Sequence, residues 1–274
     1  MQTKETDWLE LWRTLVLSKR GQHPEGASIF TRKERAEKYE ADTRRKNREK
    51  SDVLLDFVKN DLRPGEIVLD IGAGTGRWTV PLAKVAAKVT AVEPAGAMME
   101  ILKGNVQGAG VDNVEFVQAA WEAAGVERHD IVTCAHAMYM SADFGAFVRK
   151  MEAKARRRCY MAMRLFPIDG IIQEVSEEIT GLRHDGPNFI VGYNALYQMG
   201  IYGNVLIEDS NRHWTDDTVE SAFARAKRHL HLEDDTEYDR LIHETLKRRL
   251  TYKDGVYTWP DGMHSVLVWW DVVR

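Results

Sequence analysis

A glycine-rich segment carries the strongest chemical signal in the sequence. The run from Val68 to Arg77 reads Val-Leu-Asp-Ile-Gly-Ala-Gly-Thr-Gly-Arg, in which a hydrophobic strand leads into a glycine-rich turn and then a predicted helix. Glycines let a ligand approach the backbone closely, and the start of a helix offers N–H groups to an anionic group. We therefore expect a nucleotide-like ligand at the carboxyl end of this strand.

Two residues of this segment indicate which ligand it takes. The dinucleotide fingerprint G-x-G-x-x-G needs a small residue where this chain has Arg77, and the third glycine comes one position early. Asp70 would repel a pyrophosphate but attract a ligand that carries an ammonium and a sulfonium group. S-adenosylmethionine has both cations, no phosphate and one carboxylate. A nicotinamide-dependent dehydrogenase is accordingly the weaker interpretation.

A second carboxylate follows the next predicted strand. Glu93 lies seventeen residues after Gly76, where an acid that holds the ribose hydroxyls is expected in either cofactor class. Glu93 therefore supports a nucleoside ligand without choosing between the two classes.

The elements that position these residues alternate between strands and helices. We expect strands near 67–71, 89–93, 114–118, 131–135 and 159–165, with helices around 76–86, 96–107 and 143–154. This alternation predicts βαβ units and a parallel sheet. Further along, helices are expected at 171–179, 193–199, 218–230 and 237–250, with strands at 205–207 and 265–273.

Residues 1–63 are predicted to be helical, with apolar side chains at helical spacing near both ends. Between these ends, the stretch from Arg32 to Lys50 holds nine basic and five acidic residues. We interpret it as a solvated helix with side-chain ion pairs, and binding to an anionic partner is the alternative.

Together these motifs resemble the class I, Rossmann-like S-adenosylmethionine-dependent methyltransferases, especially the small-molecule branch that includes the ubiquinone and menaquinone biosynthesis type. The similarity covers roughly residues 36–165. It implies an α/β fold with a doubly wound, seven-stranded, mostly parallel sheet whose last strand is antiparallel, and Ser265 to Val273 fits that strand. Residues 1–63 would form an N-terminal helical lid or cap and 64–274 the methyltransferase domain, in which 168–204 would be a helical, acceptor-binding insertion.

The resemblance also assigns a cofactor site for S-adenosylmethionine. Asp70 to Gly76 would hold its amino-acid end and Glu93 its ribose, while Pro94 and Met98 would cover one side of the adenine. The expected cofactor-binding residues are Asp70, Gly72, Ala73, Gly74, Thr75, Gly76, Glu93, Pro94, Met98, Ala120, Trp121 and Ala135.

One departure from the family pattern concerns the adenine. Relatives usually carry Gly-Asp after the third strand, and the Asp accepts a hydrogen bond from the adenine amino group, whereas this chain has Ala119-Ala120-Trp121-Glu122. Three interpretations stay open: Glu122 replaces the missing acid, Trp121 stacks on the base, or Trp121 is a core residue without a cofactor contact.

Two residues after the fourth predicted strand are the candidates for catalysis. His136 and Tyr139 lie where the family borders the transferred methyl group, and they could accept a proton or orient a nucleophile. An in-line methyl transfer depends largely on positioning, so a packing or cofactor contact is the alternative role for His136. The expected substrate-binding residues are Tyr39, His184, Asn188, Tyr193 and Tyr197.

The composition excludes several classes of protein. The 274 residues carry 38 basic and 42 acidic side chains, a net charge of −4, which gives no broad phosphate-binding surface, so we do not expect a nucleic-acid partner. The apolar runs are too short to span a membrane. The polar N-terminus predicts no secretory signal, and Cys134 and Cys159 lie in hydrophobic strand-like runs, so we expect a cytoplasmic protein. The histidines lack metal-ligand spacing, and we expect no metal.

The leading hypothesis is thus methyl transfer from S-adenosylmethionine to a small molecule. A methyltransferase acting on RNA or protein, and a non-catalytic S-adenosylmethionine-binding protein, remain as alternatives. The identity of the acceptor, the atom that is methylated and the oligomeric state stay open.

Overall fold

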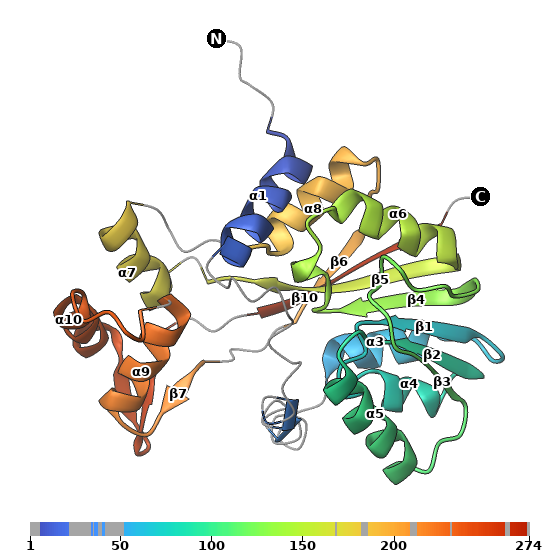
Figure 1. The fold of residues 1–274 in the computed structure, drawn as a ribbon, viewed down its shortest axis with the longest axis horizontal. Helices are drawn as coiled ribbons and strands as arrows, with labels where there is room; N and C mark the ends of the chain where they lie inside the picture. Colours follow the sequence, from blue (N-terminus) through green and yellow to red (C-terminus); the bar gives the residue numbers. More distant parts are fainter. Residues whose placement is uncertain are drawn as a thin grey trace. The chain divides into compact units, whose positions relative to one another are not determined.

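A computed structural model of the chain (Figure 1) describes residues 6–21, 34, 36–37, 40–41, 52–167, 169–181, 186–208, 213–230, 232–260 and 264–272. The chain divides into two compact units. The first comprises residues 1–163, 189–208 and 266–274, and the second comprises 164–188 and 209–265. The segment 168–204, expected as one insertion, is therefore shared between the two units.

The first unit is built on a seven-stranded sheet. Its strands are β1 (Ile67–Ile71), β2 (Lys88–Val92), β3 (Val114–Val117), β4 (His129–Ala135), β5 (Ala155–Leu165), β6 (Asn204–Ile207) and β10 (His264–Asp271). The order across the sheet is β3-β2-β1-β4-β5-β10-β6. Strands β1 to β5 pair in parallel, and β10 runs antiparallel to β6. The predicted mostly parallel sheet with an antiparallel last strand is confirmed.

Helices cover both faces of this sheet. They are α1 (Trp8–Gly21), α3 (Val53–Asp61), α4 (Thr79–Ala83), α5 (Gly96–Gly108), α6 (Phe144–Lys154) and α8 (Phe189–Gln198). Figure 1 shows α3, α4 and α5 on one side of the sheet and α1, α6 and α8 on the other. This doubly wound arrangement matches the prediction, and it explains why the central strands are almost continuously apolar.

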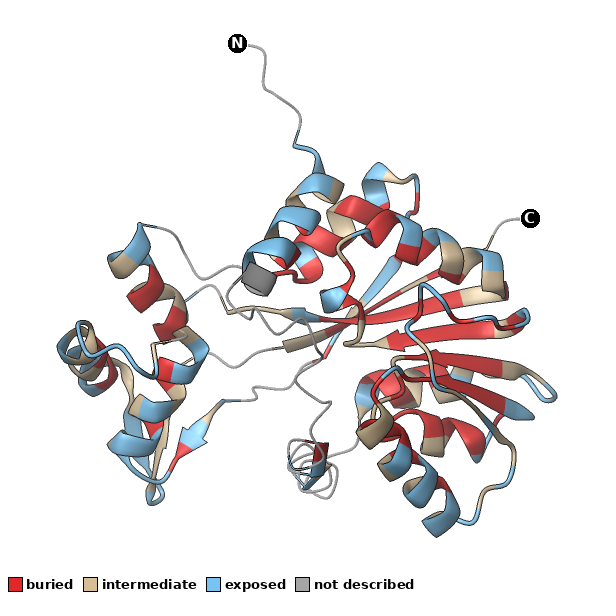
Figure 2. Ribbon diagram, in the orientation of Figure 1, coloured by how far each residue is buried: buried red, intermediate tan, exposed pale blue. Residues whose placement is uncertain are grey.

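The core of the first unit lies between the sheet and these helices (Figure 2). Val68 on β1, Ile131 on β4 and Leu267 on β10 are fully buried together with Leu54 and Leu82 from α3 and α4. A buried apolar side chain of this size contributes about 1.5–3 kcal/mol relative to an exposed one.

The second unit has its own core. It contains α7 (Ile171–Thr180), α9 (Val219–Leu230) and α10 (Asp239–Arg249), with a small sheet of order β7-β9-β8. Ile171, Ala226, Ile242 and Trp259 are among the buried residues that join these elements. The sequence analysis predicted the three helices and missed the sheet.

That small sheet has strands of two or three residues, β7 (Thr215–Asp216), β8 (Thr251–Lys253) and β9 (Val256–Thr258). Such short strands leave no periodic pattern. The Asp254-Gly255 pair between β8 and β9 has φ of 53° and 85°, the left-handed conformation of a tight hairpin turn. This Asp-Gly pair was the available signal. Across the described residues, no helix has the length and apolar composition that a membrane crossing needs.

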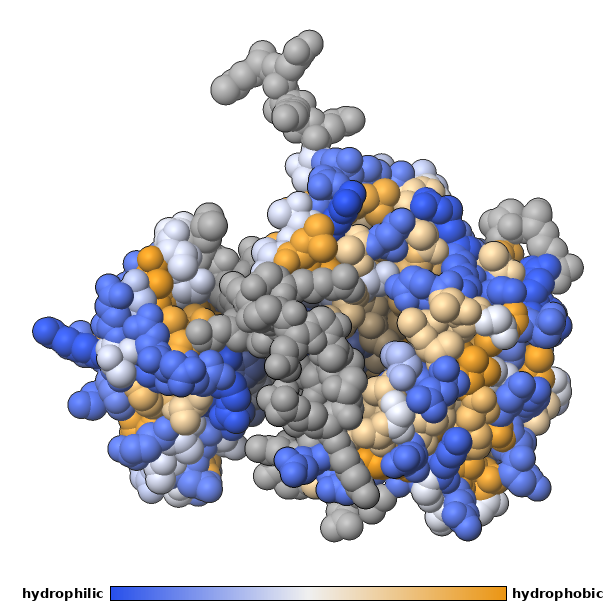
Figure 3. All heavy atoms as spheres, in the orientation of Figure 1, coloured by the Kyte–Doolittle hydropathy of each residue, from blue (hydrophilic) through white to orange (hydrophobic). Residues whose placement is uncertain are grey.

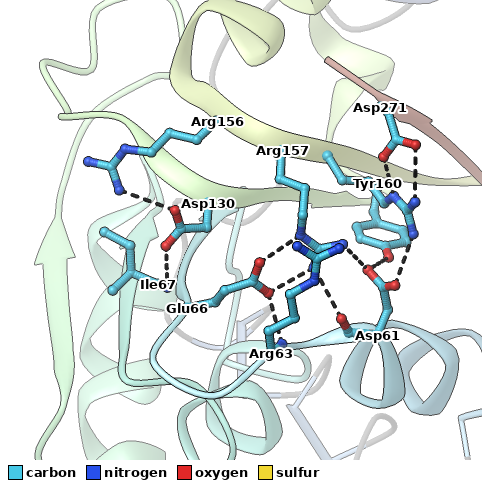
Figure 4. Close-up of polar contacts among 10 residues, drawn as sticks. Asp61, Arg63, Glu66, Ile67, Asp130, Arg156, Arg157, Tyr160 and Asp271 are labelled. Carbon is cyan, nitrogen blue, oxygen red and sulfur yellow. Dashed lines mark hydrogen bonds and ion pairs between the residues drawn. The ribbon is translucent and has the colours of Figure 1, made fainter. Parts of the chain in front are cut away.

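Three consecutive arginines begin β5, and two of them connect four elements of the first unit (Figure 4). Arg157 donates to both carboxylate oxygens of Glu66, at 2.6 and 2.8 Å, and to Asp61 Oδ2 at 2.7 Å. Arg158 donates to Asp61 Oδ1 at 2.9 Å and to Asp271 Oδ1 at 2.7 Å. These contacts join β5 to the end of α3, the start of β1 and the end of β10.

Arg156 offers a matched control for this network. Its single contact to Asp130 is 3.4 Å long, and its side chain is 41 % exposed, compared with 15 % for Arg157. Exposed ion pairs contribute little to stability, whereas removing one member of a shielded pair leaves the partner charges uncompensated.

We therefore expect Arg157→Ala to lower the free energy of unfolding by about 2 kcal/mol, and Arg156→Ala to lower it by less than about 1 kcal/mol. Urea denaturation of the two variants measures this difference. Equal losses in both would contradict a structural role specific to Arg157.

Candidate functional site

The turn that follows β1 contains three glycines in the left-handed region. Their φ angles are 69° at Gly72, 57° at Gly74 and 95° at Gly76. A Cβ added to Gly72 would lie 2.1 Å from Ala137 Cβ, and one added to Gly76 would lie 2.6 Å from Leu102 Cδ1. A Cβ on Gly74 would meet no atom of the described residues within 4 Å. The outer two glycines thus permit close packing, while the middle one faces open space.

Several backbone donors of this turn are bound within the protein. Gly72 N and Ala73 N donate to Val92 O at 2.8 and 3.0 Å, and Gly76 N donates to Ala73 O at 2.9 Å. Gly74 N donates to Glu93 Oε2 at 2.9 Å. The expected helix start is also displaced, since α4 begins at Thr79 and has five residues. These four N–H groups are therefore not available to an anionic ligand.

Asp70 lies buried at the end of β1. Its Oδ2 accepts a hydrogen bond from Thr79 Oγ1 at 2.6 Å, and its Oδ1 accepts one from Thr133 Oγ1 at 3.1 Å. Burial raises the pKa of Asp70 to about 6 although both hydroxyls favour its charged form, and the nearby Glu93 carboxylate raises it further. Among the described residues, no positive side chain appears among the groups that shift this pKa. A positively charged ligand group would stabilise the ionised carboxylate.

Glu93 lies buried at the end of β2 and ties the glycine turn to the start of α5. Its Oε2 accepts from Gly74 N and its Oε1 accepts from Ala95 N, both at 2.9 Å. Burial raises the pKa of Glu93, and the two backbone donors oppose that rise. Each carboxylate oxygen has a second lone pair, so these contacts leave room for a ligand hydroxyl.

His136 follows β4 in a strained conformation. Its φ is 59°, in the left-handed region that a non-glycine residue rarely adopts, and its backbone N donates to Ala162 O at 3.0 Å. The Nδ1 atom lies 3.3 Å from the Tyr139 hydroxyl, and the two rings stack at 6.3 Å with an interplanar angle of 25°. Such strain persists where the surrounding structure holds it, and it is common at functional sites.

A hollow with a cavity volume of about 50 Å³ lies at these strand ends and opens to solvent. Its lining residues are Asp70, Gly72, Ala73, Gly74, Thr75, Arg77, Trp78, Ala135 and His136. The structure thus brings the glycine turn, Asp70 and His136 to one place, as the sequence predicted.

The region around the hollow matches a known protein family. The family described as methyltransferase domain matches residues 68–157, which run from β1 into β5 and contain every residue lining the hollow. The hollow therefore lies in the part of the chain that is similar to a methyltransferase domain.

Three relatives show how far the similarity extends. YcgJ of Bacillus subtilis, an uncharacterized methyltransferase, is 27 % identical over 139 residues, which are 49 % of this chain and 55 % of YcgJ. The ubiquinone biosynthesis O-methyltransferase of Azorhizobium caulinodans is 35 % identical over 106 residues, 36 % of this chain and 42 % of that enzyme. The 23S rRNA (uracil(1939)-C(5))-methyltransferase RlmD of Alkalilimnicola ehrlichii is 38 % identical over 82 residues, 30 % of this chain and 18 % of that enzyme.

The fold of the methyltransferase domain is shared more widely than its sequence. The crystal structure of YcgJ aligns with a TM-score of 0.53 at 18 % identity, covering 80 % of this chain and 98 % of YcgJ. The chain spans between 18 % and 55 % of the length of the first curated relatives that it matches. These relatives are therefore similar to only part of this chain.

The hollow of the methyltransferase domain fits the amino-acid end of S-adenosylmethionine. Asp70 supplies a buried negative charge without a cation beside it, and Thr75 Oγ1 is a buried hydroxyl without a partner among the described residues. The open space at Gly74 leaves the backbone accessible at the centre of the turn. Six of the predicted cofactor residues line the hollow: Asp70, Gly72, Ala73, Gly74, Thr75 and Ala135.

The other predicted cofactor residues lie outside that lining. Met98 is buried against Ala36 and Ala95, while Pro94 and Ala120 are exposed. Trp121 is 5 % exposed, and its Nε1 donates to Phe147 O on α6 at 3.2 Å.

Lys150 holds in place the segment that stands where relatives carry the adenine-binding Asp. Its Nζ lies 4.6 Å from the centre of the Trp121 ring and donates to Trp121 O and Glu122 O at 2.6 and 3.0 Å. The Glu122 carboxylate accepts from Ser141 Oγ at 2.8 Å. This geometry favours the interpretation of Trp121 as a core residue, and the adenine contacts stay a prediction.

The predicted substrate residues are dispersed. Tyr39 and His184 lie outside the described residues. Asn188 is buried and donates to Gly186 O at 2.9 Å, while Tyr193 donates through its hydroxyl to Gly203 O at 2.9 Å. Tyr197 is exposed and its ring packs against Tyr202. None of the three described residues is among those that line the hollow, and their substrate role stays a prediction.

Two residues near the hollow were not predicted as ligands. Arg77 was noted only as a mismatch to the dinucleotide fingerprint, and it lines the hollow while its Nη2 pairs with Asp52 Oδ2 at 2.5 Å. Trp78 also lines the hollow, and its Nε1 donates to the same Asp52 oxygen at 3.2 Å. The signal available in the sequence was their position directly after the last glycine. Across the described residues, no cluster of three potential metal ligands occurs.

The buried Asp70 leads to a prediction on stability. Its folded pKa of about 6 exceeds the ordinary value of 3.8, so its contribution to stability is fully present below about pH 3.8 and is lost as the pH rises through 6. We expect Asp70→Asn to raise the free energy of unfolding of the ligand-free protein by about 1–3 kcal/mol at pH 7.5, and by little at pH 4. Urea denaturation at the two pH values measures this, and a variant less stable than the parent at pH 7.5 would contradict it.

Proposed function

We propose that this protein is an enzyme that transfers a methyl group from S-adenosylmethionine to a small-molecule acceptor. The observation that carries the proposal is the hollow in which Asp70, the glycine turn and His136 converge within a methyltransferase domain. When bound, the cofactor supplies an electrophilic methyl group on a positively charged sulfur. Small-molecule acceptors are also indicated by the ubiquinone biosynthesis O-methyltransferases among the relatives.

The residues of the chain divide the remaining tasks. Asp70 would attract the positive charge of the cofactor, and Glu93 would hold the ribose hydroxyls with the lone pairs that its backbone donors leave. The His136 imidazole would accept the proton that the acceptor loses, and Tyr139, 3.3 Å from Nδ1, would hold the ring in position. The strained backbone at His136 favours such a fixed orientation.

An aromatic cluster beside His136 holds Tyr139 against the buried core. The Trp12 ring stacks on Tyr139 at 6.3 Å and packs on Phe144 at 4.3 Å, and Trp12 Nε1 donates to Ser141 O at 2.9 Å. Leu17 on α1 and Ile190 on α8 expose 44 % and 49 % of their surface. Figure 3 shows apolar and hydrophilic side chains intermixed on one face of the molecule. We propose that α1 and α8 form part of the wall against which the acceptor binds.

This surface makes an RNA acceptor the weaker candidate. The rRNA methyltransferases among the relatives match at most 30 % of the length of this chain. The basic stretch from Arg32 to Lys50 lies largely outside the described residues, and the net charge of −4 opposes binding to a polyanion. A non-catalytic role would require that bound S-adenosylmethionine is never converted to S-adenosylhomocysteine.

The proposal is tested first by calorimetric titration with S-adenosylhomocysteine, with NAD as the parallel ligand. We expect micromolar binding of S-adenosylhomocysteine and none of NAD, and Glu93→Ala should weaken binding at least about tenfold because a buried acceptor for two hydroxyls is lost. Fractionated metabolite extracts and total RNA are then compared as methyl acceptors by S-adenosylhomocysteine release. Release with RNA alone would replace the small-molecule proposal, and no release with any fraction would favour a binding protein.

The role of His136 has its own test, in which asparagine is the suitable replacement because it tolerates the left-handed backbone. With the extract fraction that supports methyl transfer as acceptor, we expect His136→Asn to lower kcat about 100-fold, while the affinity for S-adenosylhomocysteine changes little. Tyr139→Phe should lower kcat less and shift its pH profile, because the ring orientation is loosened. A parallel loss of cofactor affinity and kcat in His136→Asn would indicate a cofactor contact instead of proton transfer.

A further inference from the structure

Two polar atoms beside the hollow are buried without a hydrogen-bond partner among the described residues. They are Thr75 Oγ1 and Arg77 Nε, and both residues line the hollow. A buried donor without an acceptor costs about 1–3 kcal/mol, so native structures rarely keep one without a reason. Because an arginine N–H donates and never accepts, the missing group at this place is an acceptor.

The Arg77 guanidinium is already held on one side. Its Nη2 pairs with Asp52 Oδ2 at 2.5 Å, and Asp52 also caps α3 by accepting from Leu55 N at 3.1 Å. The side chain of Thr75 belongs to a residue that is 2 % exposed. Arg77 is thus fixed in orientation by Asp52, while its Nε edge keeps its capacity to donate to an anion.

Four backbone donors of the glycine turn are already bound within the protein. The N–H groups of Gly72, Ala73, Gly74 and Gly76 all donate within the protein. The five-residue helix α4 starts two residues after Arg77. Side chains that line the hollow are therefore needed beside the remaining backbone N–H groups to hold an anionic ligand group there.

Asp70 lines the same hollow. Its carboxylate favours a cationic ligand group, whereas Arg77 favours an anionic one. The Asp70 carboxylate is held by two threonine hydroxyls, so it attracts a cation. One hollow thus combines an acid that lacks a cation with a guanidinium whose Nε lacks an acceptor among the described residues. The ligand chemistry that satisfies both is an α-amino acid zwitterion.

We propose that Arg77, assisted by the Thr75 hydroxyl, binds the carboxylate at the amino-acid end of the cofactor while Asp70 binds its ammonium group. This inference rests on the proposed function and deepens it, since it moves carboxylate binding from a helix N-terminus to an arginine side chain. It also gives a role to Arg77, which stands at a position where a dinucleotide-binding site needs a small residue.

The inference is tested with two ligands that differ only in the carboxylate, S-adenosylmethionine and its decarboxylated form, measured by calorimetry. We expect the parent protein to bind the carboxylated ligand at least about tenfold more tightly, because a charge-assisted hydrogen bond is lost in the other. Arg77→Gln should reduce this preference to about twofold, and Thr75→Val should reduce it by a smaller factor.

Asp52→Asn is the matched control, because it removes the ion pair with Arg77 and weakens the cap of α3 while keeping the guanidinium. It should lower stability and retain most of the preference for the carboxylated ligand. If Arg77→Gln weakens both ligands equally, or if Thr75→Val and Arg77→Gln both keep the full preference, the inference is wrong. Equal binding of the two ligands by the parent overturns the inference alone, whereas binding of neither ligand overturns the proposed function as well.

Discussion

Parallel pairing of β1 with β2 and β4 is the constraint on which the site depends. In this register Asp70 lies opposite Ala91 on one side and Thr133 on the other, so the Thr133 hydroxyl reaches the Asp70 carboxylate. The same pairing ends all three strands at one edge of the sheet. Glu93 and His136, which are distant in sequence, thereby meet the glycine turn, and the close contact of Gly72 with Ala137 requires that the first residue of the turn has no side chain.

The electrostatic state of the hollow reflects function more than stability. Burial raises the pKa of Asp70 to about 6, and Arg77 Nε and Thr75 Oγ1 lie buried without partners among the described residues. Each of these features costs free energy in the ligand-free protein and is relieved by a ligand that carries the complementary charge. Polar groups in an ordinary core are paired, so these residues mark the hollow as a binding site.

The opposite ends of the same strands carry the structural ion pairs. Arg157 and Arg158 satisfy Asp61, Glu66 and Asp271 and join α3, β1, β5 and β10. The two ends of the sheet therefore differ, since Arg157 and Arg158 are paired with carboxylates at one end, whereas Arg77 Nε and Thr75 Oγ1 lack partners among the described residues at the other. This separation lets the site keep unpaired groups while the sheet stays anchored.

The amino-acid sequence by itself determined the fold class, the order of most strands and helices in the chain, and the glycine turn with Asp70 and Glu93. These depend on local patterns, because the alternation of apolar runs and the spacing of glycines are visible along the chain. The β8–β9 hairpin was missed because strands of three residues leave no periodicity, although its Asp254-Gly255 turn was present.

Only the tertiary structure decided the roles that depend on neighbours distant in sequence. Trp121 packs under Lys150 of α6, and Arg77 pairs with Asp52 at the cap of α3, contacts that no spacing in the sequence reveals. The division of 168–204 between two compact units likewise arises from packing, since α7 joins the core with Ala226 and Ile242 while α8 packs with α1. Hydrophobic periodicity shows which face of an element is buried, and the partner that buries it is decided by the assembled fold.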